Sequence, residues 1–197
     1  MSKLLYSWIT NLADTAVVLP LSLILIGVLW REESGRAAWL FGRALLLCLT
    51  AMATLKIVLL SCGQALGTQI ASPSGHASLA VFFYGSLGTL AWARRPGGPG
   101  LCMMLAVVWL AVSIAMSRVV LGAHSATEVV IGFTVGSICL ALFAWPYLRL
   151  AHPDLRLRRI ALWLLPVFLL FYGSISPAEI MLRKLVPYFQ AAVCKQA

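Results

Sequence analysis

The chain has 197 residues, of which 61% are hydrophobic and only 11% are charged, and its formal net charge is +9. This composition is far more apolar than that of an average globular domain and indicates a protein that spans a membrane. A basic chain can also bind nucleic acid, but here the arginines gather at the connections between apolar runs, which argues against that partner.

Six apolar runs are long enough, or nearly long enough, to cross a bilayer. They lie at about 15–30, 38–62, 75–93, 101–117, 125–148 and 160–176. We therefore expect an all-α, polytopic integral membrane helical bundle with six transmembrane helices, forming a single domain over residues 1–197. Asp14 before the first run and Arg31-Glu32-Glu33 after it argue against a cleavable signal peptide. The tail from 177 to 197 is expected to form an interfacial helix on the outer face.

Arginines flank the first, third and fifth connections between these runs. They are Arg31, Arg36, Arg43, Arg94, Arg95, Arg149, Arg156, Arg158 and Arg159. With six spans, these connections lie on one side, which the positive-inside rule makes cytoplasmic. The predicted location is a bacterial inner (cell) membrane, with the loop 62–72 and the turn 119–123 facing the periplasm or exterior. The basic balance then reflects topology and attraction to anionic headgroups, and we expect the lipid bilayer, not nucleic acid, as partner.

The five cysteines show no metal-ligand spacing. Cys48, Cys102 and Cys139 lie within apolar runs and are expected to pack as small hydrophobic residues. Cys62 and Cys194 would both lie on the outer side, which leaves a disulfide between them open.

The first polar motif, Ser72-Pro73-Ser74-Gly75-His76, precedes the third apolar run. Serine before proline predicts a helix start, with Ser72 as N-cap and Pro73 at the first helical position. The amides of Ser74, Gly75 and His76 would then form an anion site at the positive end of the helix dipole. Gly75 would let a phosphate approach the backbone closely. The alternative is a capped helix with an incidental histidine.

The second motif joins the fourth and fifth runs and contains Arg118, His124 and Glu128. The i, i+4 spacing puts the imidazole of His124 and the carboxylate of Glu128 on one helical face, where the carboxylate could fix the tautomer of the ring. Glu128 also matches a capping box with Ser125, and two oxygens could serve both roles. Arg118 and Lys56 could bind phosphate oxygens or could simply extend toward the membrane surface.

Pro73-Ser74-Gly75-His76 and Ser117-Arg118, followed after five residues by His124, resemble the second and third motifs of the type 2 phosphatidic acid phosphatase family of membrane enzymes. The resemblance covers a motif-bearing core of about residues 50–148. Two positions differ from the family pattern. Glu128 stands where the family has aspartate, and Gly63-Gln64 follows Lys56 where the family has Arg-Pro, so one fixed positive charge near the phosphate is missing.

The resemblance implies dephosphorylation of a membrane lipid phosphate or pyrophosphate at the outer membrane face, with no metal and no cofactor. By this likeness, His124 would be the nucleophile that forms a phosphohistidine and His76 the acid that protonates the leaving group, with Glu128 orienting His124. The phosphate-binding residues would be Lys56, Ser74, Gly75 and Arg118. The alternatives are a lipid phosphoryl transferase and a degenerate, non-catalytic phospholipid-binding membrane protein. The sequence identifies neither the lipid nor the oligomeric state.

Overall fold

The computed structural model describes residues 3–62, 70, 72–150, 157–174, 176 and 178–189. These residues form helices, without strands in the part of the chain that is described. The helices are α1 (Lys3–Asn11), α2 (Thr15–Glu32), α3 (Gly35–Cys62), α4 (Gly75–Arg94), α5 (Gly98–Val120), α6 (Ala126–Tyr147), α7 (Leu157–Phe171) and α8 (Ala178–Phe189). The all-α prediction is therefore confirmed.

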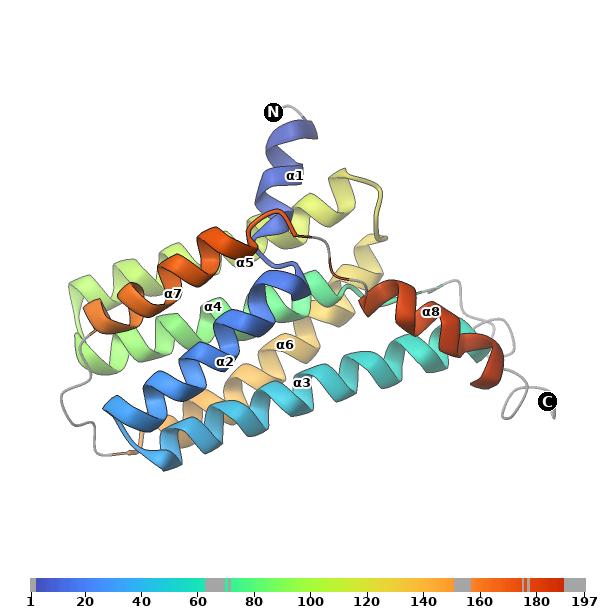
Figure 1. The fold of residues 1–197 in the computed structure, drawn as a ribbon. Helices are drawn as coiled ribbons and strands as arrows, with labels where there is room; N and C mark the ends of the chain where they lie inside the picture. The colour runs from blue at the N-terminus through green and yellow to red at the C-terminus, as the bar shows by residue number, and fades with distance from the viewer. Residues whose placement is uncertain are drawn as a thin grey trace.

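Helices α2 to α7 lie side by side along one long axis, and α4 occupies the middle of the bundle (Figure 1). Helix α4 packs against α5 and α6, while α3 packs against α2 and α6. Helix α1 leaves the bundle at an angle, and α8 lies along the C-terminal end of α3. The predicted tail helix is thus present as α8. The sequence pattern did not predict α1.

Four stretches are long and apolar enough to cross a membrane: Lys3–Glu32, Gly35–Cys62, Gly98–Val120 and Ala126–Tyr147. The first of these joins α1 and α2. Two of the six predicted spans, at 75–93 in α4 and 160–176 in α7, are therefore not among these stretches. Helix α4 carries serine and threonine side chains buried against its neighbours, which lowers its hydropathy. Helix α7 has 15 residues and ends before Gly173, which has a φ of 85° and turns the chain.

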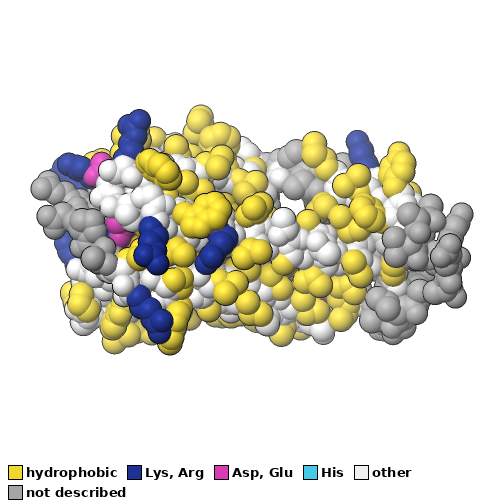
Figure 2. Space-filling view, turned by 90° about the horizontal axis from the view of Figure 1, so that it is seen from below, with side chains coloured by type: hydrophobic (Ala, Val, Ile, Leu, Met, Phe, Trp, Pro, Cys, Tyr) yellow, Lys and Arg dark blue, Asp and Glu magenta, His cyan; other side chains and the backbone are white. Residues whose placement is uncertain are grey.

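The outer surface of the bundle is strongly apolar. Large hydrophobic side chains are exposed along several helices, among them Trp30, Trp39, Trp109, Trp145 and Leu169. Figure 2 shows apolar side chains over the middle of one face, with most of its Lys and Arg side chains gathered at one end. A soluble monomer rarely exposes contiguous apolar surface on this scale. Together with the four apolar stretches, this surface is that of a membrane protein.

Aromatic side chains and one polar cluster hold together the basic end of the bundle. Phe41 packs against Phe82 and Phe143, which stacks on Tyr147. Beside them Arg94 Nη2 and Tyr147 Oη donate to Glu33 Oε1 at 2.7 and 2.8 Å. These contacts join α2, α3, α4 and α6 at the basic end, and they fix the positions of these helices relative to one another.

Two glycines bring α6 into direct contact with the start of α4. A Cβ atom at Gly132 would overlap the carbonyl oxygen of Ser74, and one at Gly136 would overlap that of Ser78. The two glycines are four residues apart and so lie on the same face of α6. Small residues at this spacing allow close approach of helices in membranes. The contact places the first turn of α4 against the first turns of α6.

Candidate active site

The start of α4 differs from the sequence prediction by two residues. Ser74, not Ser72, is the N-cap, and its hydroxyl accepts the amide of Ala77 at 3.4 Å. The predicted N-cap is therefore wrong, and Pro73 lies before the helix. The physical reason lies in α6, because Glu128 accepts the Ser72 amide at 2.8 Å with its carboxylate and the Ser74 amide at 3.0 Å with its carbonyl oxygen. These bonds hold the segment extended against α6.

This shift changes which groups can bind an anion at α4. The Ser74 amide is used by Glu128, and Ser74 itself is fully buried. The amides of Gly75 and His76 are in the first turn of the helix, where no intrahelical acceptor exists. A Cβ atom at Gly75 would lie 3.9 Å from Cε of Lys56, so the lysine of α3 reaches the same helix end. Lys56 is only 7% exposed.

The turn between α5 and α6 positions His124. Gly122 has a φ of 67°, a left-handed conformation that favours glycine. The turn then lets the carbonyl oxygen of Arg118 accept the amides of Ala123 and His124 at 3.0 and 3.2 Å. As a result, His124 is held close to the C-terminal end of α5, the helix that carries Arg118.

Glu128 makes the contacts that both roles left open by the sequence require. Its Oε2 accepts the Ser125 amide at 3.0 Å, which completes the capping box, and lies 3.2 Å from Nδ1 of His124. The other oxygen, Oε1, accepts the amide of Ser72. Glu128 is 7% exposed, so these bonds replace most of its contact with water. A proton on Nδ1 would then leave the lone pair of Nε2 available.

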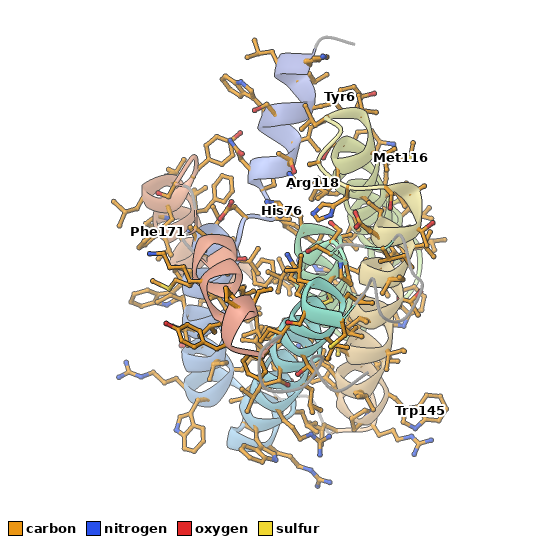
Figure 3. All side chains as sticks on the ribbon, turned by 90° about the vertical axis from the view of Figure 1, so that its right-hand side faces the viewer. Tyr6, His76, Met116, Arg118, Trp145 and Phe171 are labelled. Carbon is orange, nitrogen blue, oxygen red and sulfur yellow. The ribbon has the colours of Figure 1, made fainter. Side chains whose placement is uncertain are left out.

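Two polar residues of the N-terminal helices also reach the site, and the sequence analysis assigned neither to it. Thr10 at the end of α1 accepts a hydrogen bond from Arg118 Nη1 at 3.0 Å. Asp14, in the turn between α1 and α2, has its Oδ2 3.6 Å from Nε2 of His76. Figure 3 shows His76 and Arg118 beside each other below α1. No local spacing signals these contacts, because they join residues 62 to 108 positions apart.

These side chains line one cavity of about 810 Å³. Its polar wall includes six of the seven residues predicted from the sequence, namely Lys56, Gly75, His76, Arg118, His124 and Glu128, together with Thr10, Asp14 and Ser72. Ser74 is not in that wall, because it caps α4 beneath it. Apolar side chains of α2, α3, α4 and α8 also line the cavity, namely Leu19, Leu49, Met52, Leu79, Met181, Leu182 and Leu185.

The electrostatic surroundings favour a neutral His124. Burial, and then the positive charge of Arg118, lower its pKa below the ordinary value of 6.5, although the hydrogen bond with Glu128 acts in the opposite direction. A neutral imidazole has a lone pair and can act as a nucleophile near pH 7. Among the described residues, no group of three or more His, Cys, Asp or Glu side chains could hold a metal ion.

The fold and the cavity define a helical membrane protein that can hold a phosphate ester beside a neutral histidine. Comparison with known families agrees with this class. Residues 11–152 match the family model of the PAP2 superfamily, and the chain belongs to that superfamily, whose members are phosphatases. No curated protein and no solved structure matches the chain. The family membership supports a hydrolase that acts on phosphate esters.

Proposed function

We propose that the protein removes phosphate from a membrane lipid phosphate or pyrophosphate without a metal, through a phosphohistidine on His124. The observation that carries the proposal is the cavity itself, in which positive and histidine side chains form one part and apolar side chains line another. A phosphate headgroup fits the first part, where Lys56, Arg118 and the amides of Gly75 and His76 would hold its oxygens.

The apolar part of the cavity supports a lipid over a soluble phosphate ester. Leu49, Met52 and Leu79 line it together with Met181 and Leu185 of α8. An acyl or prenyl chain buried there would be removed from water, which favours binding by about 0.8 kcal/mol per CH₂ group. A water-soluble phosphate ester would leave this wall without a partner. Leucine and methionine do not distinguish one hydrocarbon chain from another, so the proposal is made for the lipid class.

In the proposed reaction, Nε2 of His124 attacks phosphorus while the bond from phosphorus to the lipid oxygen breaks. His76 donates a proton to that oxygen, and the lipid leaves as an alcohol or, from a pyrophosphate, as a monophosphate. Glu128, on the Nδ1 side at 3.2 Å, balances the positive charge that the ring acquires. Arg118 and Lys56 stabilise the negative charge on the equatorial oxygens.

Water completes the cycle. His76, now neutral, takes a proton from the water that attacks the phosphohistidine, the bond from nitrogen to phosphorus breaks, and inorganic phosphate leaves. His76 then carries the proton needed for the next turnover. Two displacements of lower barrier replace one direct attack by water. A general acid of this kind contributes about 10²–10⁴-fold to the rate.

The proposed membrane placement has six crossings, with the site at the outer face of a bacterial inner membrane. Helix α4 has 20 residues and is about 30 Å long, the thickness of the hydrocarbon core. Helix α7 is shorter, at about 22 Å, but packs along α2. Arg31, Arg36, Arg94 and Arg95 lie near the α2–α3 and α4–α5 connections, at the end of the bundle away from the cavity. The positive-inside rule assigns that basic end to the cytoplasm.

Phosphate release by the purified protein tests the proposal. Detergent-solubilised protein, treated with EDTA, should release inorganic phosphate from a dispersed lipid phosphate such as phosphatidic acid or a polyprenyl pyrophosphate. The His124→Ala variant should retain less than about a tenth of that rate at the same thermal stability. Binding of these lipids without phosphate release would contradict an enzymatic role. Activity that disappears with EDTA and returns with a divalent cation would contradict metal independence.

A further inference from the structure

Asp14 is the only carboxylate that the described residues place against His76. It lies in the turn between α1 and α2, where its Oδ1 accepts the amide of Ala16 at 2.8 Å and that of Ser176 at 3.2 Å. These bonds fix the carboxylate from two sides and leave Oδ2 directed at His76. Oδ2 lies 3.6 Å from Nε2, the distance of an ion pair. The side chains of Asp14 and His76 are 14% and 22% exposed.

We propose that Asp14 is the positioning residue for His76, which it holds protonated and turned toward the leaving group. This inference rests on the proposed function, in which His76 is the general acid. Because Nε2 faces Asp14, Nδ1 is the nitrogen left to meet the oxygen of the lipid. The proton passes from Nδ1 to that oxygen, and Asp14 itself exchanges no proton.

The charges around the cavity explain why His76 needs such a partner. Lys56 of α3 and Arg118 of α5 line the same cavity, and neighbouring positive charges disfavour an imidazolium. Partial burial disfavours it further. The carboxylate of Asp14 opposes both effects, because an opposite charge within about 4–6 Å favours the charged form. Asp14 is thus the group beside His76 that favours its protonated form, as Glu128 is beside His124.

The two histidines are consequently served by two carboxylates through different nitrogens. Glu128 is 3.2 Å from Nδ1 of His124, whereas Asp14 is 3.6 Å from Nε2 of His76. Each carboxylate also caps a helix, Glu128 in α6 and Asp14 in α2. The cap fixes the carboxylate, and the carboxylate in turn fixes the imidazole. Asp14, in the turn between α1 and α2, thus belongs to the site although it lies outside both sequence motifs.

An ordinary N-cap is the competing explanation for Asp14, and one substitution separates the two. Asparagine caps helices about as well as aspartate, so Asp14→Asn should keep the amide of Ala16 bonded and the protein folded. It cannot balance the charge of a protonated His76. Asp14→Ala removes both the cap and the charge, and its lower thermal stability relative to Asp14→Asn would measure the cap alone.

The test compares two substrates with different leaving groups in the purified full-length protein. A lipid phosphate has an alkoxide leaving group that needs a proton, whereas p-nitrophenyl phosphate has one that does not. For Asp14→Asn we expect kcat on phosphatidic acid to fall about 10- to 100-fold, part of the effect of a general acid, with KM nearly unchanged. The loss on p-nitrophenyl phosphate should be less than about threefold. Combining Asp14→Asn with His76→Ala should add little to His76→Ala alone.

Three results would overturn the inference. The first is Asp14→Asn activity within about twofold of wild type on phosphatidic acid, which would reduce Asp14 to a helix cap. The second is an equal loss of kcat on both substrates. The third is a fully additive loss when Asp14→Asn is combined with His76→Ala. Either of these two results would show that Asp14 does not act through proton donation by His76. A wild-type protein that releases phosphate from neither substrate would instead overturn the proposed function, and the inference with it.

Discussion

Single side chains in the cavity illustrate which contacts a sequence reveals. His124 and Glu128 are four residues apart, so helical geometry alone predicts that they meet, and the structure places them 3.2 Å apart. The approach of Asp14 to His76 has no such local signal, because the tertiary fold alone brings together residues so distant in sequence. The shift of the N-cap from Ser72 to Ser74 has the same origin, since Glu128 holds the preceding segment.

Glu128→Gln separates charge balance from capping. Glutamine can still accept the Ser125 amide and complete the capping box, so thermal stability should change little. It cannot balance an imidazolium on His124, and its NH₂ group can favour the wrong tautomer. We therefore expect kcat to fall about 100-fold or more, measured by phosphate release alongside a melting curve. Near-normal turnover in this variant would leave Glu128 as a helix cap alone.

The protonation of His124 can be measured directly. Burial and Arg118 lower its pKa, so the ring should stay neutral as the pH falls through 6.5 and should gain its proton only below that value. Titration of ring-labelled histidine by NMR gives the midpoint, and the signal missing from His124→Ala assigns it. A midpoint at or above 6.5 would show that the pull of Glu128 exceeds the effects of burial and positive charge.

At the scale of helices, the apolar runs predicted where most elements lie, and packing set the details. The run at 125–148 became α6, Ala126–Tyr147, with the predicted capping box. Helix α1 was missed because its nine residues form no apolar run long enough to cross a membrane. Helix α4 is not among the stretches apolar enough to cross a membrane, because its Ser and Thr side chains lower its mean hydropathy. These side chains are buried against neighbouring helices.

The contact between α4 and α6 gives a prediction about Gly132. A methyl group there would overlap the carbonyl oxygen of Ser74 and push the first turn of α4 away from Glu128. Gly132→Ala should therefore destabilise the protein by about 1–3 kcal/mol, as overpacking does, and should also reduce turnover. Melting temperature and kcat are the measurements. The matched control is Gly27→Ala, where the new methyl meets nothing within 4 Å and both values should stay near wild type.

This prediction fails if Gly132→Ala melts at the temperature of Gly27→Ala with equal activity. Such a result would mean that α4 and α6 can separate by the width of a methyl group without disturbing the site.

At the scale of the whole molecule, the distribution of charge predicts how the bundle lies in the membrane. In a variant without native cysteines, Arg95→Cys lies at the α4–α5 connection and Ser174→Cys in the exposed turn after α7. With six crossings, an impermeant thiol reagent added to intact cells should label position 174 but not position 95. Labelling at position 95 would reverse the orientation of the site, and protection of position 174 would contradict a crossing by α7.

Cys62 is disulfide-bonded, but Cys194 lies outside the described residues, so the pairing of these two cysteines stays open. The extent of the predicted single domain and the oligomeric state depend on tertiary and intermolecular contacts, which a sequence pattern does not encode. Apolar faces of similar composition pack against lipid or against another copy equally well. The local motifs predicted residues that line one cavity because these contacts depend on short spacings, whereas the larger assembly depends on surface shape.

The most direct test of the central claim is chemical detection of phosphate on His124. The purified protein is mixed with a ³²P-labelled lipid phosphate, quenched within milliseconds and separated from lipid. We predict a transient protein-bound phosphate that is labile in acid and stable in base, that decays with water, and that is missing from His124→Ala. A His76→Ala protein should still form it when the leaving group is good. Undiminished labelling of the His124→Ala protein, or full turnover with no labelled intermediate in rapid-quench experiments, would contradict nucleophilic catalysis by His124.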